Sequence, residues 1–448
     1  MSGEEVDHAV RRVEARRPDL GVAVQAVAGG LTGGEGVRMI HQAALQRYLW
    51  WYVPRDYPGD GWHGLVEASV ALLDELGLPR LAEVASSDAT RKVLAAWADG
   101  RKMGAAAFRA AHAKSGVEAP DTALLAWGSV IGVHEVRALE AVERALGDEI
   151  AAGYLVPGAP RWQAKAASVT EAVLSRPLDL PPGQTLAGMV TTERIGTWID
   201  TARHPVHQEW RSAVANRLLH PIGPPSNPGN AVVPVRWLLE LAAAPGGTEL
   251  TQSSYLCRAT VVAAVERFGW WDWEKPPRSE ADVHQLSTLR DAANRLRLLR
   301  RRGRRLHATT RGVELLASPD QLWEQVATET EDREDFTRAV TEVVGLRLLQ
   351  GRVEQRELVA DVAPILIAQG WSTDSGPITV DHASSAVHRP LRWWRLFNAI
   401  DEVEATREHG TARELTPHTI ALTSDGERTV LAYLRSRAAG PRHRVGDG

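Results

Sequence analysis

Apolar residues recur at steps of three and four along most of the chain, which is the spacing of one face of an α-helix. From Val37 to Tyr154, glycine or proline separates successive segments of this kind, and a second group continues to Leu219. We therefore predict an all-α helical domain over residues 37–219. The preceding residues 1–36 are predicted to form a flexible N-terminal arm that ends in a glycine-rich loop.

Residues 220–230, HPIGPPSNPGN, contain four prolines and are predicted to link two domains. After this linker the chain repeats itself, because each part contains three helical segments, a pair of strands and a further helix. The helices are expected near residues 234–244, 252–268 and 280–299 in the first copy, and near 335–349, 355–369 and 382–400 in the second. The second copy continues with strands near residues 402–408 and 419–423 and a last helix after Gly426.

Fixed points agree between the two copies. Residues 306–312 and 420–426 share the pattern apolar-x-x-Thr-x-x-Gly. A Gly-Trp pair follows the second helix of each copy, at residues 269–270 and 370–371. Three helices followed by a strand pair are typical of a winged helix, so these matches predict two such domains in tandem.

The expected fold class is therefore mainly α, with an all-α N-terminal domain followed by two winged-helix domains, each helical with a small β-hairpin. The winged-helix domains are predicted over residues 231–330 and 331–438, and residues 439–448 are predicted to be a disordered basic tail. The alternative is an irregular helical bundle with one hairpin.

Three stretches, LQRYLWW at residues 45–51, AWGSVIG at 126–132 and RRGRRLHATTRG at 301–312, carry a resemblance to a known group. The chain resembles uncharacterised actinobacterial proteins that pair a helical N-terminal region with C-terminal tandem winged-helix-like domains. In similar proteins the hairpin is often followed by a segment like ASPDQLW, residues 317–323. The resemblance covers most of the chain and implies the same domain plan, but its motifs are structural and imply no activity.

The net charge of -4 is unevenly distributed. Residues 230–330 carry 14 basic and 12 acidic groups, whereas the segments on either side are each acidic by three charges. Between Arg290 and Arg311 there are nine arginines and one acid, Asp291. A chain of this balance is not expected to bind polyanions over its whole surface. Arginine also outnumbers lysine 47 to 5 throughout, which a GC-rich genome explains, so arginine richness alone indicates little.

The densest arginine cluster falls on the predicted hairpin of the first copy, and a basic wing can hold the phosphate backbone of nucleic acid. The alternatives are a solvated surface hairpin or an interface with an acidic partner. The predicted phosphate contacts are Arg300, Arg301, Arg302, Arg304 and Arg305.

The helix expected over residues 280–299 is the candidate recognition helix. Opposite its apolar stripe it carries His284, Thr288, Asp291 and Arg295. The side chains of His284, Thr288 and Arg295 are of types that contact base edges or phosphates, and we include them among the candidate nucleic-acid-binding residues. Asp291, near the middle of that face, would repel phosphate. Two alternatives therefore remain: the helix reads base edges, or only the wing contacts the DNA, through phosphate.

The second copy is less suited to reading DNA. Its third helix carries Trp393, Trp394 and Phe397, and its wing, residues 407–419, is nearly neutral. Aromatic residues at this spacing are typical of a core. If they are exposed instead, they indicate an interface, so a homodimer or protein partner is expected to use this copy.

No constellation of catalytic or metal-ligating residues emerges, so the chain is not expected to be an enzyme and no cofactor is expected. The glycine-rich residues 29–36 lack the Gly-Lys-Ser/Thr ending of a phosphate loop. His204 and His207 have a proline between them and no third ligand at a suitable spacing. The single cysteine, Cys257, has no obvious paired histidine and is predicted to be a buried core thiol.

A chain with one cysteine forms no internal disulfide, which fits a reducing cytoplasm. The N-terminus is charged and lacks the apolar core of a signal peptide. No run of about 18 apolar residues is present, so no membrane span is expected. The sequence thus indicates a cytoplasmic DNA-binding protein, most simply a transcriptional regulator. The alternative is an interaction or scaffold protein whose winged-helix domains dimerise or dock partners.

Overall fold

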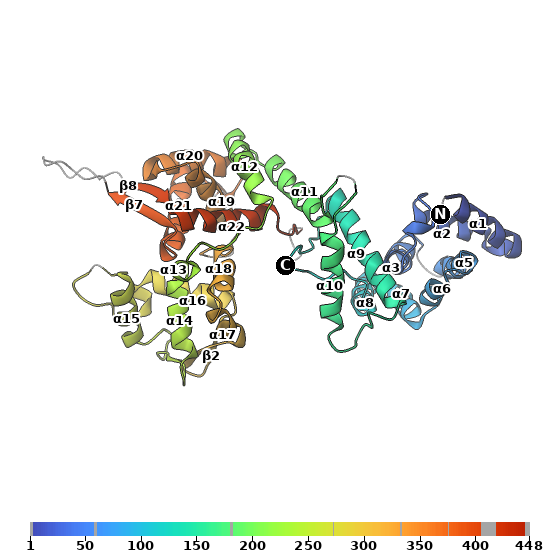
Figure 1. Ribbon diagram of the computed structural model, residues 1–448, viewed down its shortest axis with the longest axis horizontal. Coiled ribbons are helices and arrows are strands. Elements are labelled where there is room, and N and C mark those ends of the chain that lie inside the picture. Colours follow the sequence, from blue (N-terminus) through green and yellow to red (C-terminus); the bar gives the residue numbers. More distant parts are fainter. Residues whose placement is uncertain are drawn as a thin grey trace. The chain divides into compact units, whose positions relative to one another are not determined.

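The computed structural model describes residues 3–57, 61–179, 182–271, 273–331, 334–374, 376–404 and 418–443. Contacts divide the chain into two units, residues 1–190 with 441–448, and residues 191–440 (Figure 1). We call the first unit 1 and the second unit 2. Among the described residues, no helix is both long and apolar enough to cross a membrane.

Unit 1 is built from helices joined by turns. They are α1 (Gly3–Arg16), α2 (Gly21–Thr32), α3 (Gln42–Arg47), the π-helical turn Tyr48–Tyr52, α4 (Val53–Asp56), α5 (Trp62–Glu75), α6 (Pro79–Ala85), α7 (Asp88–Ala98), α8 (Arg101–Ser115), α9 (Val133–Ala151), α10 (Trp162–Ser175) and the start of α11 (Leu186–Asp200). One apolar core joins α1–α7, and another lies between α9 and α10.

The prediction of a flexible arm over residues 1–36 is wrong. Val6, Ala9 and Val13 lie at helical spacing on α1 and are buried, so this helix has an apolar face that packs against its neighbours. Helix α2 buries Val24 and Val27 in the same core. The short apolar stripe of α1 is interrupted by charges, which hid its helical period in the sequence.

Unit 2 contains the remainder of α11, α12 (Pro205–Leu218) and the two predicted copies. The first copy comprises α13 (Pro228–Ala231), α14 (Val233–Ala243), β1 (Thr248–Glu249), α15 (Arg258–Phe268), α16 (His284–Arg295), β2 (Leu299–Arg302), β3 (Arg305–Ala308), α17 (Thr310–Leu316) and α18 (Pro319–Ala327). The second comprises α19 (Asp335–Leu349), β4 (Val353–Glu354), α20 (Gln355–Ala368), β5 (Ser372–Thr373), β6 (Gly376–Pro377), α21 (Val380–Leu396), β7 (Ile400–Glu404), β8 (His418–Leu422) and α22 (Ser424–Ala438).

The sheets of the two copies have the same topology. Each is three-stranded and antiparallel, in the order β1-β3-β2 in the first copy and β4-β8-β7 in the second. The strand between the first and second helices pairs with the last strand of the hairpin in both. The copies lie on opposite sides of unit 2, with β2 at one end and β7 and β8 at the other (Figure 1). The predicted fold class, mainly α with small antiparallel β-hairpins, is confirmed.

The same hydrogen bond caps the helix that follows the hairpin in each copy. The hydroxyls of Thr309 and Thr423 cap α17 and α22, because each accepts the backbone N–H three residues later, at 3.0 and 2.9 Å. A Cβ on Gly312 would overlap the carbonyl of Leu298, and one on Gly426 would overlap that of Ala399. Neither glycine has a positive φ. The glycines are therefore required by close backbone approach and not by a left-handed backbone conformation.

Helix α12 does not belong to the N-terminal domain that the sequence predicts over residues 37–219. Although it precedes the proline-rich residues 220–230, it contacts α19 and α22 of the second copy. The division between the units accordingly falls within α11, after Val190.

Several predicted boundaries shift for local reasons. The helix expected from residue 252 begins at Arg258, because a bridge between Leu250 and Leu256 occupies the preceding residues. The helix expected over 280–299 ends at Arg295, since Arg297 has a φ of 57° and β2 follows.

In the second copy, α21 begins earlier than expected and ends at Leu396. Its N-terminus is fixed by a reciprocal cap between Thr379 and His382. The strand expected near 402–408 begins at Ile400. Most of the second wing, residues 405–417, and the end of the predicted tail, residues 444–448, lie outside the described residues.

The aromatic residues of α21 belong to the core. Trp393, Trp394 and Phe397 are 2%, 1% and 3% exposed and pack in the apolar cluster that runs through both copies. The core interpretation of these aromatics is confirmed, so they do not form an exposed interface.

Candidate nucleic-acid interface

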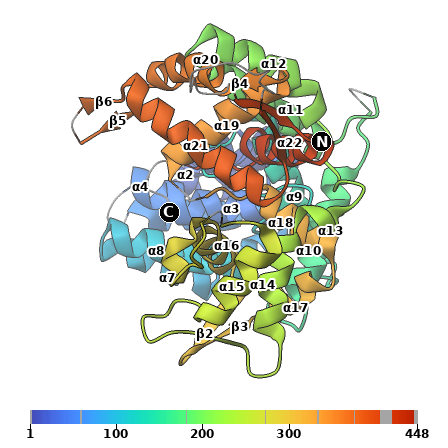
Figure 2. The same ribbon diagram turned by 90° about the vertical axis from the view of Figure 1, so that its left-hand side faces the viewer.

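The two faces of the first wing differ sharply in character. Side chains alternate along a strand, so Leu299 and Leu306 share one face with Ala308, and all three are buried. That face packs on α14, α16 and α17. Arg300 and Arg302 point the other way, to solvent. Figure 2 shows β2 and β3 at the edge of unit 2, away from the β5–β6 hairpin.

The outer face of the wing is basic and arranged in rows across the sheet. Arg302 pairs with Arg305, which in turn pairs with Glu249 of β1. The next row pairs Arg300 with His307. We call these five residues the wing face. Directly opposed like charges are unfavourable in a sheet, and a bound anion would relieve the repulsion between Arg302 and Arg305.

The five predicted wing arginines differ in how firmly they are held. Arg301 donates to the carbonyl of Gly303 at 2.8 Å, and Arg305 donates to that of Gly246 at 2.9 Å. The side chains of Arg300, Arg302 and Arg304 make no hydrogen bond or ion pair with any residue that the structure describes. All five are exposed. The wing therefore presents three unpartnered guanidinium groups to solvent.

Of the three candidates on α16, Thr288 is buried and Arg295 is partly buried, whereas His284 is exposed. Thr288 is only 7% exposed. Arg295 donates from Nη2 to the carbonyl of Thr330 at 2.7 Å. His284 Nε2 lies 3.1 Å from the carboxylate of Glu331. Thr288 is therefore not accessible to a base edge, Arg295 is engaged by the chain itself, and His284 is accessible but paired with Glu331.

A short segment, residues 328–331 between α18 and α19, contacts that face of α16 at His284 and Arg295. Glu331 contacts both copies, because Arg392 of α21 donates to its carboxylate at 3.1 Å. Glu329 is buried, and its Oε1 lies 4.0 Å from the Nε of Arg295. Helix α16 and helix α21, the third helices of the two copies, thus both contact the carboxylate of Glu331. The wing thus presents a cluster of exposed arginines that α16 does not.

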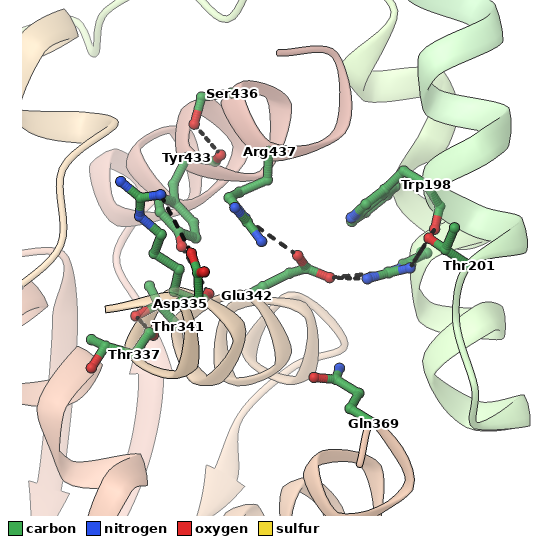
Figure 3. A network of polar contacts seen from close by, with 12 residues as sticks. Trp198, Thr201, Asp335, Thr337, Thr341, Glu342, Gln369, Tyr433, Ser436 and Arg437 are labelled. Carbon is green, nitrogen blue, oxygen red and sulfur yellow. Dashed lines mark hydrogen bonds and ion pairs between the residues drawn. The ribbon is translucent and has the colours of Figure 1, made fainter. Parts of the chain in front are cut away.

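A buried ionic cluster was missed in the sequence. His207 and Arg211 of α12 both contact Glu342 of α19: His207 Nε2 at 3.1 Å and Arg211 Nη2 at 2.6 Å. Arg437 of α22 approaches the other carboxylate oxygen at 3.7 Å. Figure 3 shows Glu342 between Arg437 and the α11 helix that carries Trp198.

This cluster explains the histidine pair that the sequence offered as a weak metal motif. Burial lowers the pKa of His207, so its neutral ring can donate to Glu342. Burial alone would raise the pKa of Glu342, but the His207 hydrogen bond and the charges of Arg211 and Arg437 outweigh it and lower that pKa to about 2. No group of three or more metal-type ligands occurs in the part of the chain that the structure describes.

Cys257 is not the buried core thiol that was predicted. It is half-buried and occupies the N-cap position of α15, where its Sγ lies 3.3 Å from the hydroxyl of Thr260. The apolar sequence around it was a poor guide, because the residue lies just before the helix and not on its buried face.

A family model described as the Y4jL N-terminal domain matches residues 230–321. The matched segment extends from α13 to the first turn of α18 and so contains the helices and hairpin of the first copy. The first copy is thus similar to a recognised domain. No curated protein matches the chain. No solved structure matches it either.

Proposed function

We propose that the protein binds DNA through the wing of its first winged-helix copy and that it acts as a transcriptional regulator in the cytoplasm. The single observation that carries the proposal is the set of exposed, unpartnered guanidinium groups of Arg300, Arg302 and Arg304. Arginines of this kind suit phosphate oxygens, which accept charge-assisted hydrogen bonds.

The proposed contact is with the backbone and not with base edges. On α16, Arg295 donates to the carbonyl of Thr330 and Thr288 is buried, which leaves only the exposed His284, itself paired with Glu331. Phosphate contacts position a protein on DNA but carry no sequence information by themselves. Sequence preference would then have to come from the shape and deformability of the DNA.

Fluorescence anisotropy with a labelled random-sequence duplex, from about 50 to 300 mM salt, tests the proposal. Each phosphate contact that is lost should reduce the slope of log affinity against log salt by about 0.9. The double variant Arg302→Ala/Arg304→Ala should therefore bind more weakly, with a slope smaller by about 1.8.

A matched double variant controls for total charge. Arg258 and Arg267 are exposed on α15 of the same copy but are not part of the wing. Arg258→Ala/Arg267→Ala should keep the slope of the unmodified protein. Equal slopes for the two double variants would contradict the proposal.

A second function, docking of protein partners, is favoured by one observation. The helices α16 and α21 are joined through Glu331, which contacts His284 and Arg392. Contacts between these two helices favour a fixed protein-binding surface over insertion of α16 into a DNA groove. This function predicts a stable oligomer or complex by sedimentation, with no DNA binding at about 150 mM salt. A monomer with salt-dependent DNA binding would exclude it.

A further inference from the structure

A cavity of about 650 Å³ lies within unit 1, among α3, α6, α7 and α8. We propose that it binds a small organic acid with an apolar body, an anionic group at the rim and a hydrogen-bond donor at the floor. The volume falls within the roughly 300–1,000 Å³ that small-molecule sites occupy. This site is independent of the proposed wing.

The floor of the cavity contains a buried acceptor with no partner. Gln46 of α3 lines the cavity and is 3% exposed, and its Oε1 makes no hydrogen bond with any residue that the structure describes. A buried amide oxygen without a partner is destabilising by about 1–3 kcal/mol. A ligand N–H or O–H at this position would satisfy it.

An irregular helix turn forms the wall beside Gln46. Residues Tyr48–Tyr52 form a π-helical turn, and Trp50 within it lines the cavity. π-Helical turns inside helices are frequently found at functional sites. The Trp50 indole is held in place, because its Nε1 donates to the hydroxyl of Thr90 at 2.8 Å. The apolar surface of the cavity is thus preformed rather than created by side-chain collapse around a ligand.

The charges around the cavity favour an anion. Arg80, Lys92 and Lys114 line it together with one acid, Glu83. No ion pair joins these three cations to a carboxylate among the described residues. Arg80 Nη2 donates to Gln42 at 2.5 Å, and burial lowers its pKa, so a nearby anion would stabilise its charge. Lys92 and Lys114 line the cavity and are exposed, so an anionic group at its opening would lie in a positive environment and in contact with solvent.

The fluorescent probe 8-anilinonaphthalene-1-sulfonate combines the three required features: an aromatic body, a sulfonate and one N–H. Its neutral analogue, N-phenyl-1-naphthylamine, keeps the body and the N–H but has no charge. Titration of the full-length protein should show saturable binding of the anionic probe at one site, confirmed by calorimetric stoichiometry. The neutral probe should bind the same site more weakly.

Two charge-reversal variants separate the rim from the rest of the surface. Lys92→Glu/Lys114→Glu should weaken the anionic probe by about tenfold and leave the neutral probe unchanged. The control Arg101→Glu/Lys102→Glu makes the same change in net charge at exposed positions on α8 that do not line the cavity. It should leave both probes unchanged.

A third variant fills the cavity. Ala111 of α8 lines the cavity and is half-buried, so Ala111→Trp should abolish binding of both probes. Circular dichroism and an unchanged melting transition identify variants that remain folded. If Ala111→Trp does not fold, Gln46→Leu replaces it, with an expected loss of about fivefold for both N–H probes. Binding that is unaffected by the rim reversal and by either cavity variant would overturn the proposal.

Discussion

Arg302 lies directly opposite Arg305 on the outer face of the first wing, so two positive charges face each other across the β2–β3 ladder. Such a pair destabilises a sheet by about 0.2–1 kcal/mol. Stability and DNA binding should therefore respond in opposite directions when this pair is broken.

Arg302→Thr should raise the free energy of unfolding by a few tenths of a kcal/mol, because threonine suits a strand and the repulsion is removed. The same change should lower the salt slope of DNA binding by about 0.9. Arg300→Thr is the matched control, since Arg300 faces His307 and not another arginine. It should lower the salt slope equally without the gain in stability. Urea unfolding and anisotropy on both variants measure the two effects.

Arg295 should behave in the opposite way to the wing arginines. Its side chain donates to the carbonyl of Thr330, a residue that is 2% exposed. Arg295→Ala removes this charge-assisted hydrogen bond, which should lower the free energy of unfolding by about 1.5–3 kcal/mol. The salt slope of DNA binding should not change, because the guanidinium is already hydrogen-bonded within the protein and does not contact phosphate. A slope that falls as much as in Arg302→Thr would place α16 in the DNA interface after all.

Local patterns predicted the helices and hairpins well because each carries its own apolar period, although the core that they build runs through both copies. The range expected for α19, residues 335–349, is the range observed, since its apolar residues repeat without interruption. The candidate site was predicted only in part. The wing arginines are exposed as expected, because alternation along β2 decides which way they point. The accessibility of Arg295 depends on residues 328–331, which follow more than thirty positions later in the sequence.

The buried cluster shows the same limit more clearly. His207 and Glu342 are 135 residues apart, so the sequence around His207 does not predict which residue it contacts. Gln46 is similar, because an amide in an amphipathic helix reads as a surface residue. Its burial follows from the packing of α6 and α9 against α3. Contacts of this kind require the tertiary structure.

The two motif glycines should tolerate substitution poorly. Gly426→Ala would force a Cβ against the carbonyl of Ala399, so the backbone must move. We expect the free energy of unfolding to fall by more than about 2 kcal/mol, as for other overpacked sites. Gly196 in α11 provides the control, since a Cβ there meets nothing within 4 Å. Gly196→Ala should stabilise the protein by about 0.5–1 kcal/mol through helix propensity. Chemical denaturation of both variants gives the comparison, and similar losses at the two positions would refute the close-approach argument.

Glu342 should dominate the acid sensitivity of unit 2. Its pKa is about 2 in the folded chain and has an ordinary value of 4.5, so the unfolded chain takes up this proton first as the pH falls. The stability it contributes is fully present above about pH 4.5 and is lost between pH 4.5 and about 2. A shift of this size corresponds to about 3 kcal/mol.

Replacing Glu342 with glutamine should lower the free energy of unfolding at pH 7 by about 3–5 kcal/mol, because Arg211, which is 7% exposed, then has no carboxylate partner. The variant should also lose part of the pH dependence between pH 4.5 and 2. Glu427→Gln is the control, since Glu427 pairs with Arg217 at the surface and should contribute no more than about 1 kcal/mol. Urea unfolding as a function of pH measures both. Equal losses for the two variants would mean that the Glu342 cluster does not hold α12 against α19, and that the packing of Trp198 and its apolar neighbours does so instead.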